Sequence, residues 1–224
     1  MPKPITLAFA VLSLVALCSG CVTSLGSTAM TTGDSGWLEP SPALRAQIED
    51  EAKRLPWTHG MERIETIHWF ASVGEPCYPT LLDMVLDPRP DVAGAALAAL
   101  GATKDSRLVE PLRELPWPDA EGSDLALERA RTLLRLGDWQ MVPHLVSGLR
   151  DERMMTRALC IQALDEATHE RFGFDPRGEA AAREASVLRW EAWTKDRLSD
   201  PLLAERVAAK QKKVGRSGAT YYDE

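Results

Sequence analysis

The chain lacks the patterns that would define a β-rich fold or a common catalytic centre. None of its 224 residues form the alternation of apolar and polar side chains that a half-buried strand requires. Beyond residue 21 there is no CxxC metal-ligand spacing, and no HExxH pair of histidines occurs. Glycine-rich phosphate loops and the GxSxG turn of serine hydrolases are also missing. We therefore expect an all-α protein, and predict no enzymatic activity, no metal site and no cofactor.

Acidic side chains outnumber basic ones in this chain. The chain holds 26 Lys and Arg against 33 Asp and Glu, which gives a net charge of −7. An acidic body repels phosphate backbones, so we predict no nucleic-acid partner. One stretch near the carboxyl end is locally basic, and we interpret it as a solvated tail or, alternatively, as a contact with anionic head groups: Arg206, Lys210, Lys212, Lys213 and Arg216.

The amino terminus has the order of a secretory signal followed by a lipidation site. Lys3 precedes an apolar run over 5–17, and the small pair Ser19-Gly20 precedes Cys21. This order predicts a signal peptide over 1–20 and lipid on Cys21. Cys18 stands where a typical lipobox has leucine. Simple secretion after cleavage near residue 20, or an uncleaved anchor helix, are the alternatives.

The next segment predicts a tether. Residues 22–37 are rich in Ser, Thr and Gly, so we expect a flexible lipidated tether over 21–40. The protein would then be lipid-anchored in the cell envelope. Val22 follows the cysteine in place of Asp. By resemblance to Gram-negative lipoproteins, this implies the periplasmic face of the outer membrane if the organism is Gram-negative.

Helical periodicity begins at residue 41 and opens a predicted helical domain over 41–200. Ser41 is suited to cap a helix that has Pro42 in its first turn. The segment PWTHG (56–60) should end that helix. Further on, three prolines lie 32 residues apart, each near the start of a short apolar helix: Pro79, Pro111 and Pro143. We expect the longer helix before each to end at a glycine, which tolerates the positive φ of that position: Gly74, Gly101 and Gly137.

A second correspondence appears at an offset of 64 residues. Asp87 and Arg89 align with Asp151 and Arg153, in links between helices. Together with the stretches 81–115 and 141–168, this pattern resembles HEAT-like repeats of the phycobilisome-lyase-like kind. The resemblance covers about 61–168. It implies an α-solenoid of about four helix pairs, in which the link arginines hydrogen-bond neighbouring repeats.

The segment after the repeats is aromatic. Phe172 and Phe174 precede a helix that carries Trp190 and Trp193. The last repeat of a solenoid has no neighbour, so we expect these rings to form a cap over its apolar face. A ligand-binding aromatic site is the alternative. Residues 201–224 should form a helical extension and a disordered tail.

Two cysteines remain in the domain. Cys77 and Cys160 belong to separate repeats about 20 Å apart, which is too far for a disulfide. Cys160 lies among apolar neighbours and should be a core residue with an unreactive thiol.

Trp57, Trp69 and Trp117 lie in or near turns. They could be wedges between repeats or rim residues of a partner-binding groove, because Trp is frequent at interface hot spots. Stacked repeats offer an extended surface that usually binds protein. The sequence therefore predicts a scaffold or adaptor for a protein partner in the envelope. A small-ligand-binding or lyase-like enzyme and a structural protein contacting the cell wall are alternatives.

Overall fold

The first helix begins where its cap predicts. The computed structural model describes residues 36–116 and 124–199. The predicted signal peptide, Cys21 and the tail beyond residue 200 lie outside these ranges. Helix α1 (Pro42–Arg54) follows Ser41, whose Oγ accepts a hydrogen bond from the backbone N–H of Leu44 at 3.3 Å. The PWTHG segment ends this helix as expected, through a 3-10 turn over Leu55–Trp57.

The described ranges are all-α, as predicted. They contain α-helices and short 3-10 turns, and no β-strand. After α1 the helices are α2 (Gly60–Val73), α3 (Tyr78–Val85), α4 (Pro90–Thr103), α5 (Val109–Glu114), α6 (Asp124–Arg135), α7 (Val142–Gly148), α8 (Met154–Thr168) and α9 (Ala180–Leu198).

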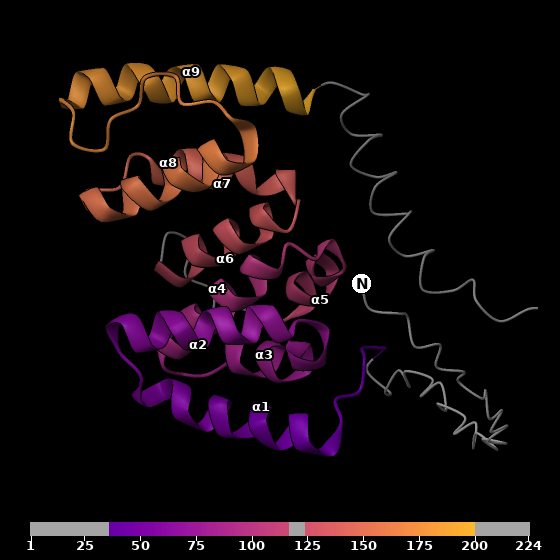
Figure 1. Cartoon of the computed structure of the whole chain (residues 1–224). Coiled ribbons are helices and arrows are strands. Elements are labelled where there is room, and N and C mark those ends of the chain that lie inside the picture. Colours follow the sequence, from indigo (N-terminus) through magenta and orange to yellow (C-terminus); the bar gives the residue numbers. More distant parts are fainter. Residues whose placement is uncertain (1–35, 117–123, 200–224) are drawn as a thin grey trace, which may run out of the picture. The chain divides into compact units, whose positions relative to one another are not determined.

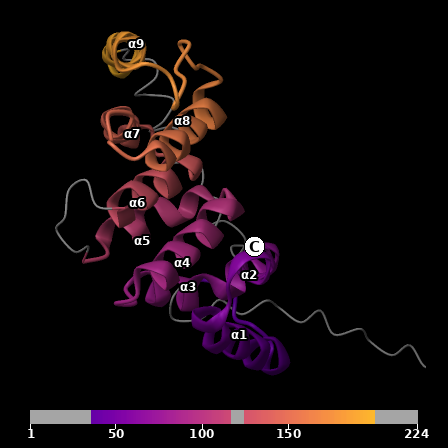
Figure 2. The same ribbon diagram turned by 90° about the vertical axis from the view of Figure 1, so that its left-hand side faces the viewer.

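Four of the longer helices, α2, α4, α6 and α8, lie side by side and point the same way (Figure 1). Three contacts set their register: Arg63 Nη2 to Asp91 Oδ2 at 2.9 Å, Thr132 Oγ1 to the carbonyl of Leu97 at 3.0 Å, and Arg153 Nη1 to Asp124 Oδ2 at 2.7 Å. Arg63, Asp91 and Asp124 lie in the first turns of α2, α4 and α6, and Arg153 is the N-cap residue of α8. The first and third contacts therefore join the starts of neighbouring helices. All four helices therefore begin at one edge, which faces the viewer in Figure 2.

The short helices α3, α5 and α7 share a local design. Each is preceded by a 3-10 turn, over Glu75–Cys77, Ser106–Leu108 and Trp139–Met141. Asp105 and Asp138 cap the second and third of these turns by accepting backbone N–H groups two residues on. The three prolines lie in the first turns of the short helices, as their spacing predicts.

The glycine prediction is right at two positions and wrong at the third. Gly74 and Gly137 follow helices with φ of +72° and +103°. Gly101 instead lies inside α4, and Lys104 takes the left-handed position with φ of +56°. A Cβ on Gly101 would lie 3.5 Å from the Cα of Thr132 on α6. This is an ordinary van der Waals distance, so the packing of α4 on α6 does not require glycine at this position.

The apolar side chains form two main clusters. The first is built largely from α1 to α5 around residues such as Phe70 and Leu97, and the second from α6 to α9 around Leu145 and Trp190. Cys77 is buried in the first cluster and Cys160 in the second, and both are free thiols. The predicted absence of a bond between them is confirmed.

The aromatic segment packs on the second cluster as predicted. Trp190 is fully buried, and its ring meets that of Phe172 edge-on at 4.8 Å. Phe174 is also buried, while Trp193 is partly buried against Trp190. Helix α9 is further held by Arg150, whose guanidinium bonds the carboxylates of two α9 residues, Glu184 and Glu191.

Candidate interaction surface

The two predicted tryptophans that the structure describes have different environments. Trp57 lies between α1 and α2 with 78% of its surface exposed. Trp69 is half-buried, packs against the first cluster and meets Phe70 edge-on at 5.1 Å. That placement fits a packing wedge better than a groove rim. Trp117 lies outside the described residues. Of the two described tryptophans, Trp57 is therefore the accessible candidate.

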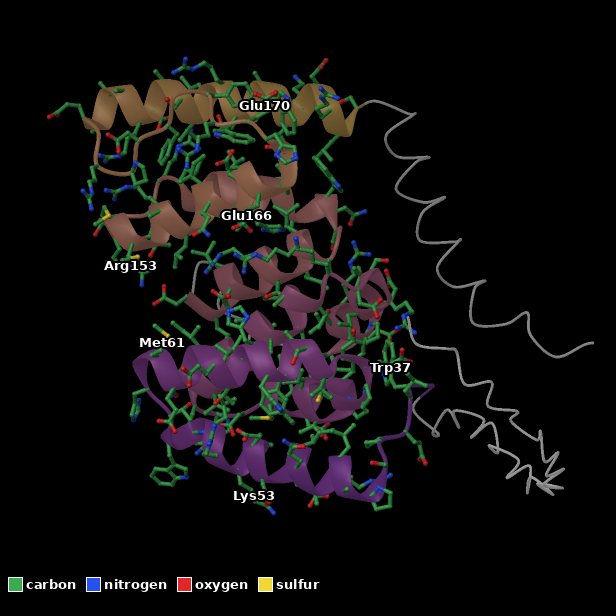
Figure 3. The ribbon with its side chains drawn as sticks, in the orientation of Figure 1. Trp37, Lys53, Met61, Arg153, Glu166 and Glu170 are labelled. Atoms are coloured by element: carbon green, nitrogen blue, oxygen red, sulfur yellow. The ribbon has the colours of Figure 1, made fainter. Side chains whose placement is uncertain are left out.

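A different group of apolar side chains is exposed where the parallel helices begin. We define the amino-terminal edge as the first two turns of α2, α4, α6 and α8. Met61 and Ile64 on α2 are 68% and 48% exposed, and Met155 on α8 is 62% exposed. Met61 and Ile64 are three residues apart and so share one helix face. Figure 3 shows Met61 and Arg153, the residue before α8, on this same side of the molecule.

The edge is hollowed between α6 and α8. A cavity of about 250 Å³ lies there, with Leu127, Met155 and Leu159 among its apolar lining residues. Arg131 and Glu128 also line it and form an ion pair with each other. Arg131 is buried, and its Nε has no hydrogen-bond partner in the described part of the chain. Asp124 and Arg153 line the cavity too and form a second ion pair, so this recess combines apolar side chains with two ion pairs.

The cavity contains a thiol, but one that is poorly suited to catalysis. Cys160 lines the recess and is fully buried. Burial raises the pKa of its thiol to about 11. Burial likewise raises the pKa of Cys77 to about 12. Both thiols stay protonated near neutral pH, whereas thiol nucleophiles react as thiolates.

The arginines of the edge are neutralised within the domain. Arg63 on α2 forms an ion pair with Asp91 on α4, and this pair joins the two helices at the edge. Arg153 pairs with Asp151 in its own link and with Asp124 on α6. It thus connects neighbouring helices, as the repeat resemblance implies.

Arg89 also bonds the aspartate of its own link, Asp87, but within the described residues it makes no hydrogen bond to a neighbouring helix, unlike Arg153. The guanidinium of Arg89 lowers the pKa of Asp87 to about 2. The bond from Arg63 similarly lowers the pKa of Asp91.

Three exposed carboxylates beside the apolar side chains have no ion pair within the described residues: Glu62, Glu65 and Glu152. Partial positive charge at the starts of α2, α4 and α6 is offset by Glu62, Asp91 and Asp124, which lie in their first turns. The edge thus combines exposed apolar side chains with a residual negative charge.

The described residues include neither a metal-binding cluster nor a membrane-spanning helix. No group of three or more His, Cys, Asp or Glu side chains in 36–116 and 124–199 could hold a metal ion. No helix within those residues is long and apolar enough to cross a membrane. Neither a family model nor a curated protein matches this chain.

Sequence reasoning missed the amino-terminal edge. Met61 and Ile64 have the three-residue spacing of a buried helix face, and Met155 follows another methionine at a helix start. The sequence contained one local signal of exposure: Glu62 directly follows Met61, and Glu65 directly follows Ile64. The exposure itself depends on which face of α2 packs on α4.

Proposed function

We propose that this protein is a membrane-tethered lipoprotein whose helical domain acts as a protein-interaction scaffold in the bacterial cell envelope. The lipid would be carried by Cys21, and the tether over 21–40 would hold the domain near the membrane surface. A protein partner would dock on the amino-terminal edge.

The repeated local geometry supports a HEAT-like solenoid as the architecture of this scaffold. The turn before a short helix recurs at Glu75–Cys77, Ser106–Leu108 and Trp139–Met141, close to the 32-residue period. The layer of α2, α4, α6 and α8 has the parallel order expected of stacked helical repeats. Such a layer offers a continuous face rather than a deep catalytic pocket.

The observation that carries the proposal is the exposure of Met61, Ile64 and Met155 on one edge. Met61 and Ile64 form an exposed apolar pair on α2, and Met155 lines the recess between α6 and α8, further along the layer. Exposed apolar side chains that recur along one edge are more typical of an interaction surface than a single exposed residue. Methionine side chains are flexible and polarisable, so they adapt to a partner. The surrounding carboxylates favour a protein partner over a nucleic acid.

The test is a cross-linked affinity pull-down of the full lipoprotein from native membranes, read by mass spectrometry. We expect one stoichiometric partner, whose recovery falls about tenfold in a variant with Met61→Glu and Met155→Glu. Both side chains are exposed, so the variant should keep its fold. Cys21→Ser should lower recovery by removing the tether.

The matched control is Leu188→Glu, which places the same charge on an exposed apolar position of α9, away from the edge. This control should leave recovery unchanged. Equal loss with the control and the edge variant, or no enriched partner at all, would refute the docking surface.

The cavity favours one second candidate, a small-ligand binder. Its apolar lining could take part of an apolar molecule, with the rim formed by charged side chains such as Asp124 and Arg153. Native mass spectrometry of the purified protein checks this candidate. A co-purifying small molecule that is lost on Leu159→Trp, which would fill the recess, supports it.

A further inference from the structure

The recess between α6 and α8 has an exposed rim and a buried floor. At the rim, Met155 is exposed, and Arg153 forms its ion pair with Asp124. At the floor, Cys160 and Arg131 are buried, with 0% and 8% of their surfaces exposed. A molecule that entered from the rim would therefore meet a thiol and a guanidinium at the bottom of the recess.

The volume of the recess suits a small molecule. An engineered apolar cavity of about 150 Å³ in another protein takes up benzene, which has about six non-hydrogen atoms. In proportion, the cavity of about 250 Å³ between α6 and α8 holds about ten such atoms. Sites for drug-sized ligands have volumes of about 300–1,000 Å³, so a ligand of that size would not be enclosed here.

The floor of the recess contains a hydrogen-bond donor that the protein does not use. Arg131 donates from Nη1 to the carboxylate of Glu128 on the same helix. Its Nε is buried and has no hydrogen-bond partner within the described residues. Burial raises the pKa of the Cys160 thiol and the charge of Arg131 opposes this rise, so the guanidinium lies near the thiol. A buried donor without a partner costs free energy, and a ligand oxygen beside Arg131 would remove that cost.

The charges that line the recess sum to zero. Arg131 is paired with Glu128, and Arg153 is paired with Asp124. An ionised ligand would bring an additional, unpaired charge toward a buried floor, where the loss of hydration is costly. The recess therefore favours a neutral molecule over an anion or a cation.

We infer that the recess between α6 and α8 binds one small neutral molecule that is apolar except for a hydrogen-bond-accepting oxygen. The oxygen accepts a hydrogen bond from the guanidinium of Arg131, and the apolar part contacts Leu127, Met155 and Leu159. Small ketones, ethers and esters have this chemistry. The inference rests on the second candidate function, the small-ligand binder, and names the class of its ligand.

The test is a binding titration of the full chain in lipid nanodiscs, with ¹³C-methyl-labelled methionine and NMR detection. The methyl signal of Met155 reports on the recess, and the methyl signal of Met61 on α2 is the internal control. The probes are four phenyl compounds with the same number of non-hydrogen atoms: acetophenone, cumene, benzoate and benzamidinium. Acetophenone is neutral and has an acceptor oxygen, cumene is neutral and has none, and the other two are charged.

We expect acetophenone to shift the Met155 signal and to leave the Met61 signal in place. Benzoate and benzamidinium should bind at least about tenfold more weakly than acetophenone, because each loses hydration without gaining a free counter-charge. Leu159→Trp, which fills the recess, should abolish the shift of the Met155 signal.

The variant Arg131→Met with Glu128→Gln tests the hydrogen bond. It removes the donor and also the carboxylate charge that would otherwise be left unpaired. The ratio of the acetophenone affinity to the cumene affinity should fall about tenfold, since only acetophenone loses a hydrogen bond to a charged group. The matched control, Arg135→Met with Glu166→Gln, removes an ion pair between the same two helices outside the recess lining and should leave the ratio unchanged.

The outcomes separate this inference from the functions on which it rests. If benzoate or benzamidinium binds most tightly, or if the ratio is unchanged in the Arg131 variant, the class of ligand is wrong while the small-ligand binder stands. The ranking of the four probes is measured on the unaltered chain, so it decides the class even if that variant does not fold. If no probe shifts the Met155 signal, the inference is wrong whether or not native mass spectrometry finds a co-purifying molecule. The pull-down tests the docking surface separately.

Discussion

At the residue scale, Gly148 is the position where a single added carbon has the clearest consequence. It is the last residue of α7, and a Cβ there would lie 2.6 Å from the Sγ of Cys160 and 3.1 Å from a methyl group of Leu127. We expect Gly148→Ala to lower the free energy of unfolding by about 1–3 kcal/mol through overpacking. Urea unfolding followed by circular dichroism measures this change.

Cys160→Ala removes the clashing sulfur, so the double variant should lose less than the sum of the two single variants. Gly94→Ala is the matched control, because a Cβ at Gly94 meets nothing within 4 Å inside helix α4. It should raise the free energy of unfolding by about 0.5–1 kcal/mol. Equal losses at both glycines would contradict the close packing of α7 on α8.

At the element scale, α9 depends on one buried indole. Trp190 is fully buried, yet its Nε1 has no hydrogen-bond partner within the described residues. We expect Trp190→Ala to lower the free energy of unfolding by about 3–5 kcal/mol, because it leaves a cavity beneath α9. Trp190→Phe should cost clearly less, since it keeps an aromatic ring and removes a donor that makes no bond.

Denaturant unfolding of the two variants provides the comparison. Leu188→Ala, on the exposed side of the same helix, should change the free energy of unfolding by no more than about 0.5 kcal/mol. If Trp190→Phe is as destabilising as Trp190→Ala, the indole N–H contributes a hydrogen bond and the packing account of α9 is wrong.

At the scale of the whole molecule, the link carboxylates should make the domain sensitive to acid. Hydrogen bonds from Arg89 and Arg153 lower the pKa of Asp87 and of Asp151, respectively. Folded pKa values below the unfolded values mean that this stabilisation is present above about pH 4. It is lost as the pH falls toward 2, and urea unfolding at a series of pH values should show this loss.

A variant with Asp87→Asn and Asp151→Asn should show a shallower fall in stability between about pH 4 and 2. Each pair is exposed, so the difference should be small and should shrink further in high salt. An unchanged pH profile in this variant would show that other carboxylates dominate the acid response.

Local features of the helices could be predicted because they depend on residues close together in sequence. The cap at Ser41, the first-turn prolines and the positive φ of Gly74 and Gly137 all follow from local backbone chemistry. Burial of Trp190 was predicted for a similar reason, because an aromatic segment next to an apolar helix needs a partner surface.

Sequence patterns were wrong or left alternatives open where the outcome depends on packing between distant residues. Gly101 has the signature of a helix end, but α4 continues through it to Thr103, and Lys104 takes the left-handed position. Trp69 looked like a rim residue or a wedge, and packing against the first cluster favours the wedge. Sequence patterns predicted nothing about Met61 and Met155, whose exposure in the structure gives the candidate edge.

The sequence by itself determined that the described part of this chain is helical, where α1 and the short helices α3, α5 and α7 begin, and that its two domain cysteines stay apart. These properties arise from periodicity, capping and spacing along one chain. Only the tertiary structure decided which faces of α2 and α8 remain exposed and that four helices begin at a common edge. The reason is physical: burial and register are set by pairs such as Arg63 with Asp91 and Arg153 with Asp124, whose partners are 28 and 29 residues apart.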